Sequence, residues 1–450
     1  MTEATLLRHG EARLPRYTSY PTAPNFASVV GASQYARWLA ELAPDEPVSL
    51  YVHVPFCRSM CWYCGCHTTI TARDAPIEAY LGSLHAELAL VAGLAPAPLK
   101  VAALHFGGGT PTIMGPERFS RLMQALRRHV SFTPDAELAI EIDPRTLSRP
   151  MIAALAEGGI TRASLGVQSF DPAVQQAINR VQSIAETEAA VTGLRAAGIA
   201  RINFDLIYGL PRQTVASCRK TVAAALALAP DRFAVFGYAH VPDFKKHQRL
   251  IEEAALPGCA ERIEQALAIG EALVAAGYVP VGLDHFARPG DPLAEAAATG
   301  RLHRNFQGYT TDSCPTLIGL GASAIGQTRA GFVQNAVPIG RYQQAVAAGG
   351  LATARRYLLT ADDRLRAEII ERLMCDFSAN IGAIAARHGA DAAALLENNA
   401  RLQALVEEGV AEIDRGTVLV PVRHRFLVRT VAAAFDAYLD TARRLGSKVA

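Results

Sequence analysis

The sequence predicts an α/β fold: a partial (βα)6 TIM-like barrel of parallel strands, with an N-terminal arm and a C-terminal, mainly helical, winged-helix-like domain. Strand-like and helix-like segments alternate from residue 47 onward. Half of the 450 residues are hydrophobic, which allows a large buried core. Polar side chains gather where several of the predicted strands end, as they do in the active sites of βα barrels. A flat doubly wound sheet is the alternative.

Hydrophobic periodicity defines the individual elements of the predicted barrel. The predicted strands are 48–54, 100–106, 136–142, 161–167, 200–207 and 232–239. The predicted helices are 78–92, 117–130, 172–197, 215–228 and 260–276. In the second of these helices, Phe119, Leu122 and Leu126 recur at three- and four-residue spacing, which is typical of one buried helix face.

The two ends of the chain differ from the barrel in pattern. Residues 1–45 are predicted to be an irregular, extended arm because they contain Pro15, Pro21 and Pro24. The barrel is expected at 46–345, with a loop-rich extension, and a helical domain at 346–450. The end of that domain is typical of a winged helix, but residues 401–450 carry eight basic and six acidic side chains. A lid or packing role is therefore favoured over DNA binding.

Composition excludes several broad classes of function. The net charge is +2, from 44 basic and 42 acidic residues, which gives no sign of a nucleic-acid or membrane partner. The first residues lack the apolar core of a signal peptide. No uninterrupted apolar run approaches the ~18 residues that cross a bilayer. We expect a cytoplasmic protein, and a monomer.

Four of the eight cysteines lie within ten positions, in LYVHVPFCRSMCWYCGCH directly after the first predicted strand. Cys57, Cys61 and Cys64 have C-x3-C-x2-C spacing. Three thiolates on one loop can ligate three irons of a [4Fe–4S] cube and leave the fourth iron open for a small molecule. A zinc site is the alternative, but zinc sites usually combine two C-x2-C pairs, and the sequence has no second pair. The four scattered cysteines are expected to pack as small apolar residues.

Polar residues at the predicted strand ends suggest a ligand site beside these cysteines. Glu141, Gln168 and Asp205 each alternate with buried apolar positions on their strands. A glycine-rich segment, HFGGGTPT at 105–112, follows the second strand. Glycines allow backbone amides to approach a ligand closely, although tight turns also require them.

These features resemble the radical S-adenosylmethionine (SAM) superfamily, in which the open iron chelates SAM and one electron yields a 5′-deoxyadenosyl radical. The resemblance is closer still to one family, the oxygen-independent coproporphyrinogen III oxidases, and extends over nearly the whole chain. The motifs that carry it are PRYTSYPTA (15–23), YVHVPFC…CWYCGC (51–66), HFGGGTPT, IEIDP (140–144), LGVQSF (165–170), NFDLIYGLP (203–211), GYAH (237–240), DHFARP (284–289), HRNFQGYTT (303–311) and GASAI (321–325).

The resemblance implies two SAM molecules per chain and the residues that bind them. Those implied for the first are Tyr51, Gly108, Glu141 and Ile325. Those implied for the second are Tyr63, Gly109, Thr110, Gln168, Arg180, Asp205 and Ala239. Cys66 matches a cysteine that lies near the cluster without ligating it. We expect Tyr51, Cys66 and Glu141 to be catalytic; His53, on the same strand face as Tyr51, is expected to have either a catalytic or a packing role.

The family converts two propionates of coproporphyrinogen III to vinyl groups and forms protoporphyrinogen IX in haem biosynthesis. Its members need a reduced electron donor such as a flavodoxin or ferredoxin. The four substrate propionates require cationic partners. The candidates are Arg16, His285, Arg288, His303 and Arg304.

Three other functions remain to be distinguished. A haem chaperone of the same superfamily typically has Phe at the position of Cys66 and lacks the PRYTSYPTA segment. The HFARP and HRNFQGYTT segments argue against a haem-degrading radical methyltransferase. An iron–sulfur electron carrier would not need an open iron or the glycine-rich segment.

Overall fold

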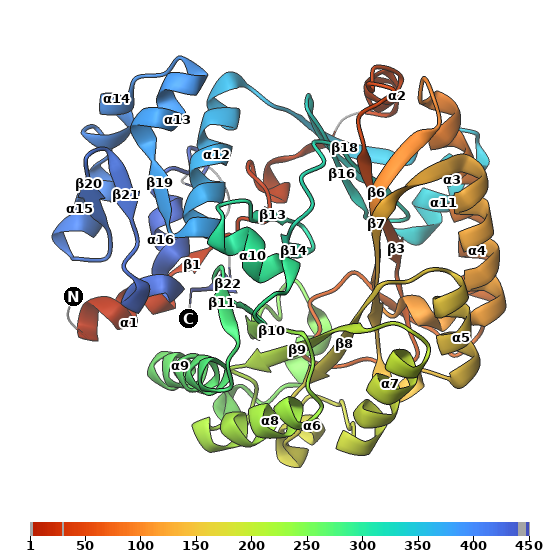
Figure 1. Ribbon diagram of the computed structural model, residues 1–450, viewed down its shortest axis with the longest axis horizontal. Coiled ribbons are helices and arrows are strands. Elements are labelled where there is room, and N and C mark those ends of the chain that lie inside the picture. Colours follow the sequence, from red (N-terminus) through yellow and green to blue (C-terminus); the bar gives the residue numbers. More distant parts are fainter. Residues whose placement is uncertain (1–2, 29–30, 440–446, 450) are drawn as a thin grey trace.

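The fold is built on one long, curved sheet, seen in a computed structural model that describes residues 3–28, 31–439 and 447–449 (Figure 1). Six of its strands are parallel and neighbour one another in chain order. They are β3 (Val48–Val54), β6 (Leu99–Gly108), β7 (Val130–Ile142), β8 (Arg162–Gln168), β9 (Arg201–Tyr208) and β10 (Arg232–Gly237). The predicted partial (βα)6 barrel is therefore confirmed, and the flat doubly wound alternative is not required.

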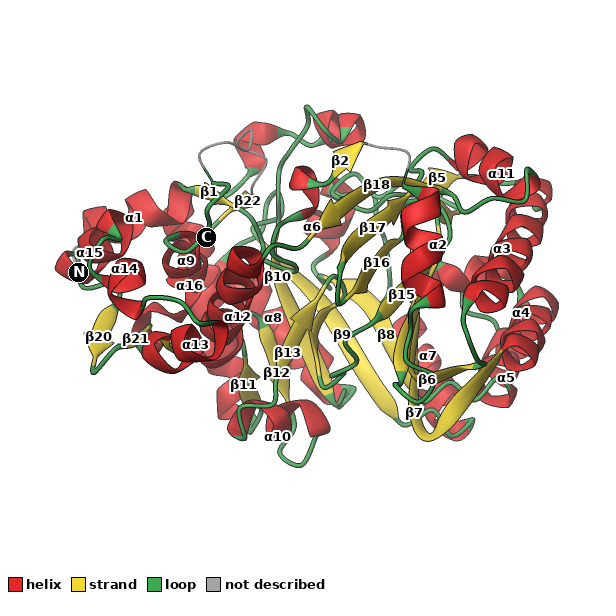
Figure 2. Ribbon diagram, turned by 90° about the horizontal axis from the view of Figure 1, so that it is seen from above, coloured by secondary structure: helices red, strands yellow, loops and turns green. Residues whose placement is uncertain are grey.

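Helices cover the convex face of this sheet (Figure 2). They are α3 (Ala75–Leu94), α4 (Pro116–His129), α5 (Arg149–Glu157), α6 (Pro172–Ala177), α7 (Ile184–Ala196), α8 (Val215–Ala227) and α9 (Cys259–Ala275). The prediction of one helix at 172–197 was wrong, because the chain leaves helical geometry at Asn179 and begins again after Ser183. Asn179 has φ +53°, and Ser183 caps α7 by accepting from the Glu186 amide.

The sheet continues beyond the six strands at both ends and does not close. β15 (Leu317–Leu320) pairs in parallel with β3 and leads into four antiparallel strands. These are β16 (Ile325–Thr328), β17 (Gly331–Asn335), β18 (Thr353–Leu358) and β2 (Ala27–Ser28). The other end carries β12 (His285–Ala287) and β11 (Val279–Val281), beyond β10. Smaller elements are β4 (Phe56–Cys57), β5 (Thr69–Ile70), α10 (Pro292–Ala298), β13 (His303–Asn305), β14 (Gly308–Thr310) and α11 (Ile339–Ala347).

The N-terminal arm contains more regular structure than its prolines suggest. The prediction of an irregular segment at 1–45 was wrong for α1 (Glu3–Glu11) and α2 (Ala32–Ala40). Between these helices the chain has only short elements, and Tyr17 and Tyr20 are buried against the C-terminal domain. Burial of apolar side chains such as Tyr17 and Tyr20 therefore determines the course of this segment more than its prolines do.

The C-terminal domain has a hydrophobic core of its own. It comprises α12 (Ala361–Asp376), β19 (Ser378–Asn380), α13 (Ile381–His388), α14 (Ala392–Leu396), α15 (Ala400–Glu407), β20 (Glu412–Asp414), β21 (Thr417–Leu419) and α16 (Val428–Ala433). The three strands form an antiparallel sheet beside the helices, as the winged-helix prediction requires. Because β18 still belongs to the main sheet, we propose a division after Leu358 rather than after residue 345. β1 (Arg13–Leu14) pairs with β22 (Ser447–Lys448), joining the two ends of the chain.

Among the described helices, α3 alone has the length and composition that could cross a bilayer. In this fold it packs against α2, α4 and α11. Its side chains Tyr80, Leu84 and Glu87 are buried in the protein, where Glu87 accepts hydrogen bonds from Tyr342 and Asn335. The helix is therefore accounted for as a core element.

Candidate active site

A cavity of about 1040 Å³ opens at the carboxyl ends of the parallel strands. Thirteen of the sixteen predicted site residues line it: Cys57, Cys61, Tyr63, Cys64, Cys66, Gly108, Gly109, Thr110, Glu141, Gln168, Arg180, Asp205 and Ala239. Tyr51, His53 and Ile325 lie behind this wall. Carboxyl ends of successive parallel strands converge at one edge of a sheet, so residues far apart in sequence meet there.

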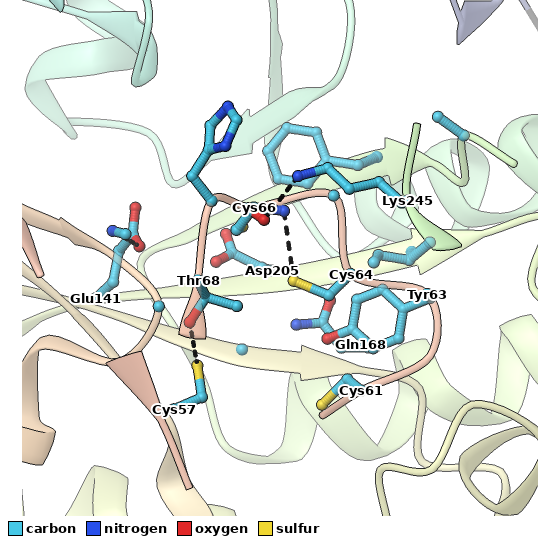
Figure 3. Close-up of a pocket in the computed structure, with 18 of the residues that line it drawn as sticks. Cys57, Cys61, Tyr63, Cys64, Cys66, Thr68, Glu141, Gln168, Asp205 and Lys245 are labelled. Atoms are coloured by element: carbon cyan, nitrogen blue, oxygen red, sulfur yellow. Dashed lines mark hydrogen bonds between the residues drawn. The ribbon is translucent and has the colours of Figure 1, made fainter. Parts of the chain in front are cut away.

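Of the three cysteines of the C-x3-C-x2-C motif, Cys57 ends β4, and Cys61 and Cys64 lie on the loop between β4 and β5 (Figure 3). The thiol of Cys57 lies 3.3 Å from the Thr68 hydroxyl and 3.4 Å from the Thr110 hydroxyl. The amide of Cys66 donates to the sulfur of Cys64 over 3.4 Å. Such donors stabilise negative charge on sulfur, the form in which cysteine ligates a metal.

Two arginines stabilise the third thiol. Arg145 and Arg180 approach the Cys61 sulfur at 3.7 and 3.6 Å. Both guanidinium groups also pair with Asp143, at 2.6 and 3.3 Å. Beside Cys61, two guanidinium groups thus share one carboxylate, and the Arg180 side chain is almost fully buried. Arg180 was among the predicted site residues, but Arg145 and Asp143 were not, although Asp143 lies within the IEIDP motif and Arg145 directly after it.

The segment after β10 holds the cysteine loop in place from the opposite side. Lys245 donates to the Cys66 carbonyl over 2.9 Å, and His247 donates to the Cys64 carbonyl over 2.7 Å. Gln248 donates to the Tyr63 carbonyl over 2.9 Å. All three bonds go to backbone carbonyls, which every residue has. No side-chain pattern in the sequence could therefore have identified these contacts.

The glycine-rich segment packs directly beneath the cysteine loop. A Cβ atom on Gly109 would lie 2.5 Å from both the Phe56 carbonyl oxygen and the Thr68 hydroxyl, so no larger residue fits. Gly108 has φ +122°, and its amide donates to Glu141 over 3.2 Å. These glycines therefore bring β6 close to the cluster loop and fix one oxygen of Glu141.

A row of ring side chains supports Glu141 from the neighbouring strands. The Tyr51 hydroxyl donates to Nδ1 of His53 over 2.9 Å, and Nε2 of His53 donates to the His67 carbonyl over 3.1 Å. Tyr51 also stacks on His105, whose Nε2 lies 3.3 Å from Glu141. Burial lowers the pKa of His53, which keeps the ring neutral in this network.

Two further acceptors project into the cavity from β8 and β9. Gln168 adopts φ +64° at a bulge in the pairing of β8 with β9, and its Oε1 is buried without a partner. Asp205 accepts from Ser164 at 3.1 Å and from Asn203 at 2.8 Å. Burial, and then the charge of Glu141, raise the pKa of Asp205 to about 7. An orphaned buried acceptor and a raised carboxyl pKa are typical of a ligand site.

Two further predicted site residues are Ala239, which contributes a backbone carbonyl, and Ile325, which lies on a strand next to the cavity. The Ala239 carbonyl accepts from Gln248 over 3.2 Å. Ile325 begins β16, where it pairs with Gln334, a residue that lines the cavity. Cys66 is exposed and lines the cavity.

Three of the five predicted propionate partners have other contacts. His285 bonds to Asp284 over 2.7 Å, and His303 lies 3.1 Å from Glu371. Arg288 donates to the Ala229 carbonyl over 2.9 Å. It lines neither this cavity nor a second, smaller cavity that adjoins it.

The donor set fits an iron–sulfur cluster. Cys57, Cys61 and Cys64 supply three free thiols around one cavity, each beside a hydrogen-bond donor. In the part of the chain that the structure describes, no three Cys, His, Asp or Glu side chains converge on a single ion position. The three thiols are therefore spaced around the cavity wall rather than gathered at one point.

Comparison with known proteins decides the family. A sequence profile of the radical SAM superfamily matches residues 51–225, and one of the HemN C-terminal domain matches 359–426. The chain is 60% identical over 440 residues to the oxygen-independent coproporphyrinogen III oxidase of Bradyrhizobium diazoefficiens, with 98% of each chain covered. The chain belongs to this oxidase family. It is also 39% identical to the oxidase of Salmonella typhimurium, over 96% of this chain and 94% of the other.

A solved structure of the family shows the same fold. Coproporphyrinogen III oxidase from Escherichia coli, described as a radical SAM enzyme, superposes with a TM-score of 0.90 at 38% identity, over 94% of this chain and 98% of the other. Membership of the family implies a [4Fe–4S] cluster and SAM as cofactors.

Proposed function

We propose that this family member converts two propionate side chains of coproporphyrinogen III to vinyl groups without oxygen and so forms protoporphyrinogen IX. One observation carries the proposal: three free thiols, an unpartnered Gln168 oxygen and the Asp205 carboxyl line a single cavity of about 1040 Å³. A cavity of this size suits a large substrate together with its cofactors.

Cys57, Cys61 and Cys64 would hold the cluster. When bound, the cluster and SAM supply one-electron chemistry and a 5′-deoxyadenosyl radical. The chain itself positions the cluster and its ligands and excludes water from the cavity. Thr68, Thr110 and the two arginines beside Cys61 donate to the sulfur atoms, and such donors tune the potential of a cluster.

The cavity wall offers complementary partners for two SAM molecules. Glu141 keeps acceptor capacity for an ammonium group, since its side chain is 41% exposed. Gln168 Oε1 and Asp205 can accept from ribose hydroxyl groups. Tyr51 and His53 hold Glu141 in place through Gly108 and His105, which supports positioning roles for both. Cys66 can contribute a hydrogen atom or orient a cofactor from the cavity edge.

The proposal includes a monomer that acts in the cytoplasm and receives electrons from a reduced flavodoxin or ferredoxin. The balanced net charge of +2 supports the absence of a nucleic-acid partner.

Anaerobic incubation of the reconstituted protein with coproporphyrinogen III, SAM and a reductant tests the proposal. Chromatography of the oxidised products should show protoporphyrin IX, with the three-propionate intermediate appearing first. Tight haem binding without any vinyl product would assign the protein to the chaperones instead.

A further inference from the structure

A second cavity, of about 310 Å³, adjoins the candidate active site. Arg16, Phe236 and Gly237 line both cavities and so form their common wall. The second cavity lies between α9, the strands β10 and β12, the N-terminal arm and the C-terminal domain. We call it the arginine cavity, because Arg16, Arg304, Arg425 and Arg429 line it.

Positive charge in this cavity exceeds the available negative charge. Two carboxylates line it, and both are already bonded: Asp284 to His285 at 2.7 Å, and Glu271 to Arg219 at 3.3 Å. Arg16, Arg304 and Arg425 form no ion pair with any described carboxylate. This is the opposite of the wall beside Cys61, where two arginines share Asp143.

Arg16, Arg304 and Arg425 share a single nearby carboxylate, because the charge of Asp284 acts on all three. Arg16 donates to the Gly237 carbonyl over 3.1 Å, and Arg304 donates to the Arg16 carbonyl over 3.2 Å. Two nitrogen atoms of Arg304 and the Nε of Arg425 are buried with no acceptor. Burial lowers the pKa of Arg16 and of Arg425, whereas Tyr309 and Asp284 raise the pKa of Arg304 against the effect of its burial. Unpaired buried cations are costly, so an anion that enters this cavity gains several charge-assisted bonds.

The remaining wall of the arginine cavity is apolar. Ile263, Leu267 and Val274 come from one face of α9, and Phe236 and Phe286 come from the strands. A volume near the ~300 Å³ lower limit of small-molecule pockets is too small for a tetrapyrrole. The cavity suits one edge of a pyrrole ring that carries a propionate. The ring would contact the apolar wall, and the carboxylate would pair with the arginines.

We propose that the arginine cavity is a carboxylate subsite, in which Arg16, Arg304 and Arg425 bind a substrate propionate that is not at the reaction centre. This inference rests on the proposed function and extends it. Arg304 stacks on Tyr309 at 4.5 Å and Arg425 on Phe377 at 5.1 Å, so both guanidinium groups are already oriented. Arg425 gives the C-terminal domain a part in substrate binding.

The test uses anaerobic holoenzyme and coproporphyrin III, the stable oxidised tetracarboxylate, as the binding probe. Arg304→Gln and Arg425→Gln should each raise its Kd about tenfold, the loss expected for one charge-assisted pair. Arg304→Lys, which keeps the charge without the planar fork, should fall between wild type and Arg304→Gln. Arg288→Gln is the matched control and should leave the Kd unchanged.

Further measurements separate this subsite from a structural role and from the proposed function. The glutamine variants should keep their iron content and Tm, because they remove mutual repulsion, and turnover should show a raised KM with little change in kcat. Active wild type with unchanged KM and Kd in both variants overturns the subsite and leaves the function standing. Arginine-dependent binding without vinyl product sustains the subsite and overturns the function. Tm stabilisation by inorganic phosphate, but not by coproporphyrin III, would assign the cavity to a free anion and overturn the proposal.

Discussion

The two adjoining cavities of this protein are built in different ways. The wall around the cysteines comes from short motifs at consecutive strand ends, and both of its arginines, Arg145 and Arg180, pair with the carboxylate of Asp143. The arginine cavity combines the arm, the strand β13 and the C-terminal domain, and its Arg16, Arg304 and Arg425 form no ion pair with a described carboxylate. The comparison shows that both walls leave groups for a ligand, but of opposite kinds: the first offers free thiols and the unpartnered Gln168 oxygen, whereas the second offers arginines that have no paired carboxylate.

The largest loss of activity should follow from replacing the cysteines that would bind the cluster. Cys57→Ser, Cys61→Ser or Cys64→Ser should abolish both cluster binding and product formation, because three thiolates are the minimum for the cube. Iron and sulfide content, together with anaerobic turnover, checks this prediction. Cys259→Ser, at the half-buried start of α9, is the control and should keep about four irons per chain. A fully active variant that contains only zinc would contradict the assignment.

Cys66 should separate cluster binding from chemistry. Its thiol is exposed in the cavity, while its backbone amide donates to Cys64 and survives any side-chain change. Cys66→Ser should therefore keep the iron–sulfur spectrum and lose ~10²-fold in product formation, the loss expected when a reacting group is misplaced by about 1 Å. A nearly silent variant would make Cys66 a spare cysteine, and loss of iron would make it a ligand.

SAM binding at the second predicted position should depend on pH through Asp205. Its pKa is raised to about 7 by burial and by Glu141, against the lowering effect of the hydrogen bonds from Ser164 and Asn203. The ionised form is the better acceptor, so affinity should hold above pH 7 and weaken by up to about tenfold for each unit below it. Asp205→Asn should flatten this dependence.

Equilibrium dialysis with labelled SAM at several pH values measures this effect. With reduced substrate present, binding to wild type should approach two SAM per chain. Gln168→Ala should weaken one of the two sites more than the other. A single-site isotherm for wild type would exclude the second molecule.

The smallest expected effect is the change in the free energy of unfolding when an arginine without an ion pair, Arg304, is replaced; Arg232, which has an ion pair, is the comparison. Arg232 lies 2.8 Å from Asp291, and both side chains are buried. Arg232→Gln should lower the free energy of unfolding by ~3–5 kcal/mol, because it leaves Asp291 uncompensated. Arg304→Gln should change it by less than ~1 kcal/mol. Denaturant titration of both variants decides this, and an equal loss in both would mean that Arg304 serves the fold.

The cysteine wall was predictable from the sequence because its determinants are local. The six strands follow apolar patterns, and Glu141, Gln168 and Asp205 follow from their places at strand ends. The break between α6 and α7 was missed, although the S-x-x-E spacing of Ser183 and Glu186 is typical of a helix start. There the chain turns so that Arg180 can reach Cys61, and this tertiary contact overrides helix propensity.

The arginine cavity was only partly predictable. Arg16 and Arg304 were candidates because a substrate with four carboxylates needs cations, but so were His285 and His303, which bond to acidic side chains of the protein. Arg425 lies in a domain whose pattern indicated packing alone. Its place depends on how the C-terminal core docks on the barrel, and a one-dimensional pattern does not encode that contact.

One measurement tests the central claim most directly. Coproporphyrinogen III labelled in its propionate carboxyl carbons is incubated anaerobically with holoenzyme, SAM and reductant, and the porphyrin product and labelled carbon dioxide are measured in the same reaction. The account predicts protoporphyrinogen IX with two labelled carbon dioxide molecules for each product formed. Cleavage of SAM with neither carbon dioxide nor vinyl product would contradict it.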